Sequence, residues 1–266
     1  MTITGAVRTT QPSPAGAVVT VTGTPLTPVT VAADGRYQFR VPLGEYDLAV
    51  AMPANRCTKA GTAHVVATAN VTADVTLPDR TDQYGYSCAE GTGGSATGTQ
   101  LLALAGDDAA AAVTLPFAFP LYGTAYSTAW ATTNGTIGFL GAHTQSYNTF
   151  LPVSGEPNGA LYPFWDDLVV DGSASVYTTV GASAVVFEWR NVAFVQQQSA
   201  RITFSATLRP DGSVTYGYSS IGTDQYERAY SATIGLENET GTDGLAYSAL
   251  EVGLTDGRTI TFRPPA

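Results

Sequence analysis

The sequence has few basic residues and little charge of either sign. Its 266 residues include 12 Lys or Arg and 22 Asp or Glu, and Lys59 is the only lysine, so the net charge is −10. Nucleic acids and anionic membrane surfaces are bound by clusters of Lys and Arg. The composition therefore argues against both as partners.

Long hydrophobic runs are also absent. No apolar stretch approaches the ~20 residues that a transmembrane helix needs, and we expect no membrane insertion. No basic segment followed by an apolar one stands at the N-terminus, and we expect that any signal peptide has been removed. Charged residues make up 13% of the chain, against about 25% in an average soluble protein. Thr, Ser, Gly and Ala take their place, which is typical of secreted or cell-surface β-proteins.

Cysteine is scarce, with only Cys57 and Cys88. Two cysteines can form a disulfide, half of a metal site, or two separate buried thiols. A zinc site would need further soft ligands, and neither His64 nor His143 stands at ligand spacing. We expect a disulfide, which implies an oxidising compartment outside the cytoplasm. Closing a loop of ~30 residues would add roughly 3–4 kcal/mol on the chain-entropy model.

What the sequence does contain is hydrophobic alternation with period 2, as in residues 18–22, 37–41 and 46–50. This period is typical of β-strands. Proline and Asx-Gly pairs such as Asn134-Gly135 separate the segments, as expected of tight turns. No window has helical periodicity with caps. The sequence predicts an all-β protein of two β-sandwich domains.

The first predicted domain covers residues 1–78. Its segments ITGAV, GAVVTVTG and ADGRYQFRVPLGEYDLAV resemble the carboxypeptidase regulatory-like (transthyretin-like) β-sandwich, over most of residues 2–77. This resemblance implies a non-catalytic accessory domain of secreted enzymes or surface proteins. Residues 79–112, rich in Gly and Ser at 91–98, are predicted to be a connector that a disulfide would fasten back onto the first domain.

The second predicted domain covers residues 113–266 and has enough short strands for a larger, jelly-roll-like sandwich. The segments LPFAFPLYG, TTNGTIGF, PNGALYPFWDDL, RPDGSVTYGY, ATIGLEN and GTDGLAYS resemble a domain of bacterial secreted proteases and surface proteins. That domain is distantly similar to the nidogen extracellular (NIDO-like) domain. The resemblance implies an extracellular, non-catalytic role in adhesion or recognition.

Aromatic and amide side chains around a Pro-rich turn are the candidate ligand-binding residues: Tyr147, Asn148, Phe150 and Tyr162. Gln196 and Tyr226 fall in other loops. Stacking faces beside amides and hydroxyls suit a neutral glycan or an extended peptide. The alternating aromatics of the strands, in contrast, are expected to be core.

The sequence Trp165-Asp166-Asp167 is the sharpest local feature. With Asp171, or with Asp107 and Asp108, these carboxylates could ligate calcium, which takes ~6–8 oxygen ligands. Alternatively, the aspartates cap turns after a strand ends. We expect no cofactor other than, on the first interpretation, a structural calcium ion.

Catalytic patterns are weak. A glycosidase would need a carboxylate pair, such as Asp166 or Asp167 with Glu188 or Glu237, but acidic chains always offer such pairs. No GxSxG segment accompanies either histidine, so a serine hydrolase is not expected. The sequence favours a non-catalytic extracellular binding or adhesion module that recognises a polysaccharide, a matrix protein or a partner domain. The alternatives are a structural spacer in a surface protein or fibre and, less favoured, a glycan-active enzyme.

Overall fold

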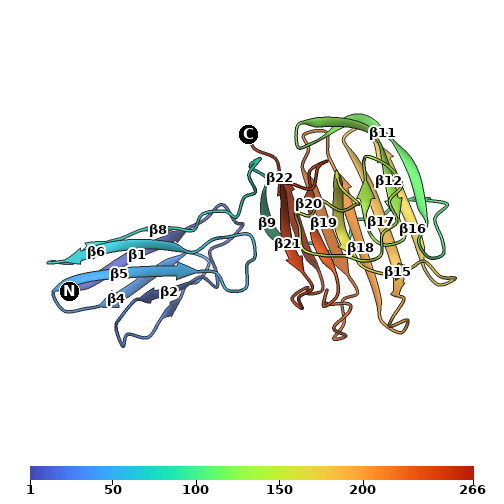
Figure 1. Ribbon diagram of the computed structural model, residues 1–266. Helices are drawn as coiled ribbons and strands as arrows, with labels where there is room; N and C mark the ends of the chain where they lie inside the picture. Colours follow the sequence, from blue (N-terminus) through green and yellow to red (C-terminus); the bar gives the residue numbers. More distant parts are fainter. The chain divides into compact units, whose positions relative to one another are not determined.

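The computed structural model describes all 266 residues and consists of β-strands joined by turns and loops (Figure 1). No helix long and apolar enough to cross a membrane is present. The chain divides into two compact units, Met1–Arg80 and Thr81–Ala266. The predicted all-β fold is confirmed.

The smaller unit contains eight strands in two sheets. They are β1 (Thr2–Arg8), β2 (Val18–Val21), β3 (Val29–Thr30), β4 (Arg36–Arg40), β5 (Gly44–Ala51), β6 (Gly61–Ala67), β7 (Val71–Thr72) and β8 (Val75–Thr76). One sheet has the order β4-β1-β7, with β8 also paired to β1, and the other has the order β3-β2-β5-β6. The two sheets enclose one hydrophobic core.

Buried and exposed side chains alternate along the strands, and the buried ones form this core. In β4 the side chains of Tyr37 and Phe39 are buried while the arginines on either side are exposed, as the pleat of a strand requires. The Tyr37 hydroxyl donates to the carbonyl of Ala73. A Cβ atom at Gly5 would lie 1.8 Å from that same carbonyl oxygen, so only glycine fits opposite the tyrosine.

The larger unit contains fourteen strands. They are β9 (Ser87–Thr92), β10 (Gln100–Leu101), β11 (Ala110–Leu121), β12 (Thr124–Thr132), β13 (Ile137–Gly138), β14 (Ala160–Trp165), β15 (Leu168–Val169), β16 (Ser175–Gly181), β17 (Ala184–Phe194), β18 (Arg201–Leu208), β19 (Val214–Ser219), β20 (Thr233–Glu237), β21 (Gly244–Ala249) and β22 (Arg258–Arg263). One sheet has eight strands, in the order β10-β16-β17-β18-β19-β22-β9 with β15 paired to β17, and the other has the order β11-β12-β13-β14-β20-β21.

Large aromatic side chains fill the space between these two sheets. The ring of Phe164 from β14 lies 5.5 Å from that of Phe204 on β18. Polar tips of other rings reach across: Tyr218 donates to the Pro163 carbonyl at 2.7 Å. Tyr216 and Trp189 donate in the same way to carbonyls of the six-stranded sheet at 2.8 Å. These aromatics therefore join the sheets by hydrogen bonds as well as by packing.

The domain boundary differs from the prediction. It falls between residues 80 and 81, and the predicted connector of residues 79–112 lies almost wholly in the larger unit. It contains strand β9, which pairs with β22 at the edge of the eight-stranded sheet. Cys57 and Cys88 are both disulfide-bonded, as predicted.

Candidate functional site

The candidate site lies where β14 ends, and a buried asparagine organises it. Asn134 is fully buried, and its side-chain oxygen accepts a hydrogen bond from the Leu168 amide at 3.0 Å. Its Nδ2 donates to Asp108 at 2.7 Å and to the Thr144 carbonyl at 2.9 Å. The following Gly135 has φ +71°, and a Cβ there would lie 2.1 Å from the Phe164 carbonyl oxygen. The Asn-Gly turn thus holds the segment after β14 in place.

The long loop between β13 and β14 is fastened over the six-stranded sheet by side-chain hydrogen bonds. The indole nitrogen of Trp165 donates to the Gln145 carbonyl at 2.7 Å. Asn148 donates to the Ser231 carbonyl and to the Thr233 hydroxyl. The loop therefore has defined anchors on both sides of Tyr147.

These segments enclose a hollow of about 240 Å³ in the larger unit. We call it the tyrosine–aspartate hollow, and it is lined by Ser146, Tyr147, Asn148, Asp166, Asp167, Gln196, Tyr226, Tyr230, Ser231 and Leu250. Its walls come from the loop before β14, the segment after β14, the β17–β18 loop, the segment before β20 and the residue after β21. Four of the residues singled out from the sequence as site candidates lie in it together.

The predicted ligand-binding residues differ in their placement. Tyr147 is 94% exposed and lines the hollow, and Phe150 is 65% exposed close by in the same loop. Asn148 lines the hollow too, but its amide nitrogen serves to anchor the loop. Tyr162 is the exception, because it is fully buried and its hydroxyl is engaged by Pro157 and Glu237. It supports the loop from beneath and is not on the surface that a ligand would touch.

The two adjacent carboxylates of the hollow are held differently. Asp166 is 3% exposed and accepts hydrogen bonds from the Ser231 hydroxyl at 2.6 Å and from the Asp167 amide at 2.8 Å. Burial raises the pKa of its carboxyl to about 6. Asp167 accepts from Gln196. Its pKa is raised by partial burial, and also by the negative charges of Asp107 and Asp108.

Asp171 lies apart from this pair. It forms a two-pronged ion pair with Arg201, with distances of 3.0 and 2.5 Å. These hydrogen bonds lower the pKa of Asp171 to about 2. No group of three or more His, Cys, Asp or Glu side chains is arranged to hold a metal ion. The structure thus places Asp171 on an arginine and not with Asp166 and Asp167, and structural calcium stays a prediction.

The other carboxylates considered from the sequence also lie outside the hollow. Glu188 is paired with Arg190 at 2.7 Å and accepts from the Gly98 amide at 2.8 Å. Glu237 is fully buried and accepts from the Val153 amide at 2.6 Å. Neither glutamate lines the hollow. The hollow therefore does not bring Asp166 or Asp167 together with either glutamate.

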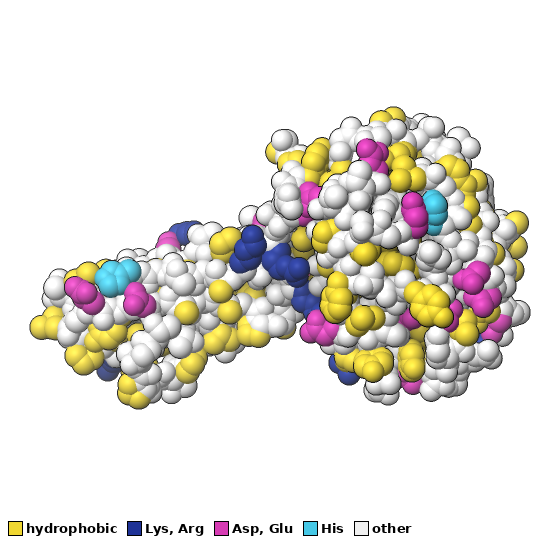
Figure 2. Space-filling model, in the orientation of Figure 1, with side chains coloured by type: hydrophobic (Ala, Val, Ile, Leu, Met, Phe, Trp, Pro, Cys, Tyr) yellow, Lys and Arg dark blue, Asp and Glu magenta, His cyan; other side chains and the backbone are white.

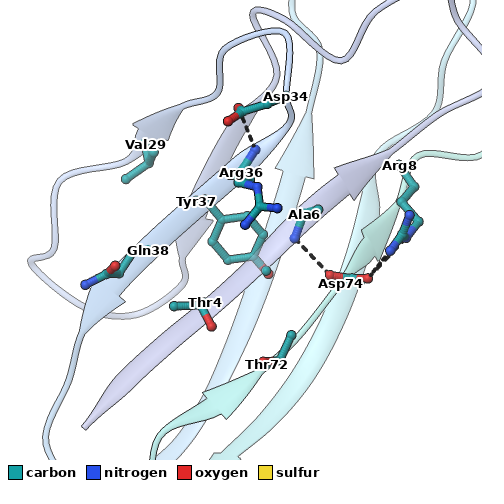
Figure 3. A pocket seen from close by; sticks show the side chains of 11 residues that line it. Thr4, Ala6, Arg8, Val29, Asp34, Arg36, Tyr37, Gln38, Thr72 and Asp74 are labelled. Atoms are coloured by element: carbon teal, nitrogen blue, oxygen red, sulfur yellow. Dashed lines mark hydrogen bonds and ion pairs between the residues drawn. The ribbon is translucent and has the colours of Figure 1, made fainter.

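The smaller unit carries a wider groove of about 710 Å³ on its β4-β1-β7 sheet (Figure 3). Small and polar side chains line it, and Arg8 and Asp74 form an ion pair at 2.6 Å. Asp74 also accepts from the Ala6 amide at 2.9 Å. No exposed aromatic side chain lines this groove. We therefore regard the tyrosine–aspartate hollow as the better candidate.

Sequence reasoning missed part of the hollow. Tyr230, Ser231 and Leu250 were not singled out, although Tyr230 is 48% exposed and Leu250 43% exposed. In the sequence these positions show only a tyrosine and a serine just before a strand. That pattern is too common to indicate a binding site. Tyr230 and Ser231 join the site because β20 pairs with β14. Leu250 joins it because β21 pairs with β20, which places the end of β21 beside the start of β20.

The fold and the site together define a disulfide-bonded β-sandwich protein with a loop-built hollow. A family model described as NIDO related matches residues 83–263, and the chain belongs to this family. The predicted NIDO-like character of the second domain is confirmed. A search of curated proteins found no match. The resemblance of residues 2–77 to the carboxypeptidase regulatory-like family stays a prediction.

Proposed function

We propose that this protein is a non-catalytic extracellular binding module that takes its partner, a protein or polysaccharide outside the cell, at the tyrosine–aspartate hollow. The observation that carries the proposal is the convergence of Tyr147, Tyr226 and Tyr230 with polar groups in one hollow on a rigid sandwich. Loops held by a rigid scaffold are the usual place for recognition. The disulfide and the NIDO-related family support an extracellular location.

Exposed aromatic side chains at the rim support recognition in preference to a purely structural role. Tyr147 and Phe150 project from an anchored loop and have no ring contact with other aromatic side chains of the protein. Side chains of this kind dominate binding energies at protein interfaces. A spacer would gain nothing from keeping them in solvent.

The test is a binding array of glycans and extracellular matrix proteins, probed with the wild type and with the double variant Tyr147→Ala/Phe150→Ala. We expect the variant to lose binding by at least tenfold, which corresponds to about 1.4 kcal/mol, while its thermal midpoint stays unchanged. The control is Leu101→Ala, which removes a 67% exposed side chain from β10. Undiminished binding by the double variant would remove the hollow as the contact surface, and silence of the whole array would favour the spacer alternative.

A further inference from the structure

The carboxylates of the hollow lack the arginine partners that some other acidic groups of this protein have. Asp74, Asp171, Glu188 and Glu90 each form an ion pair with an arginine. Asp166 and Asp167 form none, and no lysine or arginine lines the hollow. One oxygen of Asp167 is bonded to Gln196 and the other accepts no hydrogen bond from the protein. The second oxygen of Asp167 is therefore free to accept a hydrogen bond from a cationic group outside the protein.

Neighbouring charges add to this negative field. Asp107 and Asp108 both act on Asp167, and Asp108 is held near the hollow through Asn134. Acidic side chains are spread over the face of the larger unit in Figure 2, where basic ones are few. With a net charge of −10, the protein attracts and orients cationic partners.

The walls of the hollow suit an organic cation. Tyr147, Tyr226 and Tyr230 supply aromatic rings beside the two carboxylates, and aromatic faces attract ammonium and guanidinium groups. The volume of about 240 Å³ is smaller than the ~300–1,000 Å³ typical of pockets for whole small-molecule ligands. One long side chain would fill such a space. A metal ion would leave the aromatic walls unused.

From these observations we infer that the tyrosine–aspartate hollow receives a lysine or arginine side chain of a partner protein. The inference rests on the proposed function and narrows its ligand class. The charged head would meet Asp167, and the apolar stem would lie against the tyrosines and Leu250. Exposed Tyr147, Tyr230 and Leu250 line the hollow, and Tyr is enriched at protein interfaces.

The test is an NMR titration of the full chain with the peptide acetyl-Gly-Gly-Lys-Gly-Gly-amide, its arginine counterpart, and the same peptide with a neutral Nε-acetyl-lysine. We expect saturable amide shifts at residues 146–148, 166–167 and 226–231 with the two basic peptides only. Raising the salt concentration from 50 to 500 mM should weaken the binding, because it screens charge attraction. Equal binding of the acetylated peptide would overturn the inference.

The variant Asp167→Asn should raise the Kd of the basic peptides by about tenfold or more, since removing one partner of a charge pair is costly. The matched control is Glu45→Gln, which removes one charge from an exposed site in the smaller unit and should leave the Kd unchanged. Full affinity of Asp167→Asn for the basic peptides would overturn the inference. It would also be overturned if Ca²⁺ shifted the same amides and none of the peptides did.

The two proposals fail in different ways. If the basic peptides do not bind while Tyr147→Ala/Phe150→Ala abolishes binding to a glycan or matrix protein, the cationic ligand is wrong and the binding function stands. If a neutral oligosaccharide shifts the hollow amides and the basic peptides do not, the same conclusion follows. If neither the basic peptides nor any member of the binding array binds through these residues, the proposed function fails as well.

Discussion

Glu237 is a buried carboxyl group beneath the loop that carries Tyr147, and its surroundings favour the protonated form. Tyr162 contacts both the Pro157 carbonyl and a Glu237 oxygen, the latter at 2.9 Å. A hydroxyl has one proton, so if it donates to Pro157 the contact with Glu237 needs a proton on the carboxyl group. Burial raises the pKa of Glu237 to about 7, in agreement with this geometry.

The variant Glu237→Gln should therefore stabilise the protein at high pH. The folded pKa is raised from 4.5 to about 7, so the folded state binds a proton that the unfolded state has already lost. Stability consequently falls as the pH rises from about 4.5 through 7. Glutamine imitates the protonated acid, because its oxygen can accept from Val153 and its amide can donate to Tyr162.

We expect Glu237→Gln to exceed the wild type by on the order of 2 kcal/mol at pH 8 and to differ little near pH 4.5. Urea unfolding at both pH values measures this difference. A variant that is equally destabilised at both pH values would show that the carboxylate form is the one the fold uses.

At the level of strands, irregularities in the six-stranded sheet explain why buried tyrosines are tolerated in the core. The pairing of β14 with β20 shifts register between Tyr162 and Trp165. Pro163 lies in this interval, and proline cannot donate to a strand ladder. Its carbonyl accepts the hydrogen bond from Tyr218 of the facing sheet. The Tyr218 hydroxyl of the eight-stranded sheet thus gives the Pro163 carbonyl of the six-stranded sheet a hydrogen-bond partner.

Replacing Tyr218 with Phe should cost about 1–2 kcal/mol of the free energy of unfolding, since it leaves a buried carbonyl without a partner. Chemical denaturation of the variant measures the loss. The control is Tyr177→Phe on β16, where the ring stacks on Arg190 at 4.1 Å and the hydroxyl forms no hydrogen bond with the protein. Equal stability of Tyr218→Phe and wild type would mean that water replaces the bond.

Strand prediction from the sequence succeeded for most elements and failed at β9. The predicted segment 46–50 lies within β5, and the predicted segments 18–22 and 37–41 coincide with β2 and β4 to within one residue. The segment of β9 was assigned to a connector because the Gly- and Ser-rich residues 91–98 begin at its end. It is a strand because it pairs with β22, far away in sequence. Local periodicity carries no information about such a partner.

For the molecule as a whole, the disulfide is the strongest single constraint on the unfolded chain. Reduction should lower the free energy of unfolding by roughly 3 kcal/mol on the chain-entropy model. Urea unfolding with and without a reductant measures the effect. The variant Cys57→Ser/Cys88→Ser should match the reduced wild type and should not respond to the reductant. A wild type that is insensitive to reduction would contradict the constraint.

The amino-acid sequence alone determined the all-β character, most turns, the disulfide and the NIDO-related family, because each of these leaves a mark in neighbouring residues. Period 2 records which side chains face a core, and Asx-Gly pairs record where the chain reverses. The same rules also predicted Tyr147 and Phe150 as loop residues, and both are exposed.

The environment of each site residue depended on the three-dimensional pairing of strands. Tyr162 is buried because the loop before β14 folds over it, and Asp171 meets Arg201 across the β17–β18 part of the eight-stranded sheet. Ser231 reaches Asp166 only because β20 lies beside β14. Which side chains meet is set by contacts between residues far apart in the chain, and no local pattern encodes these contacts.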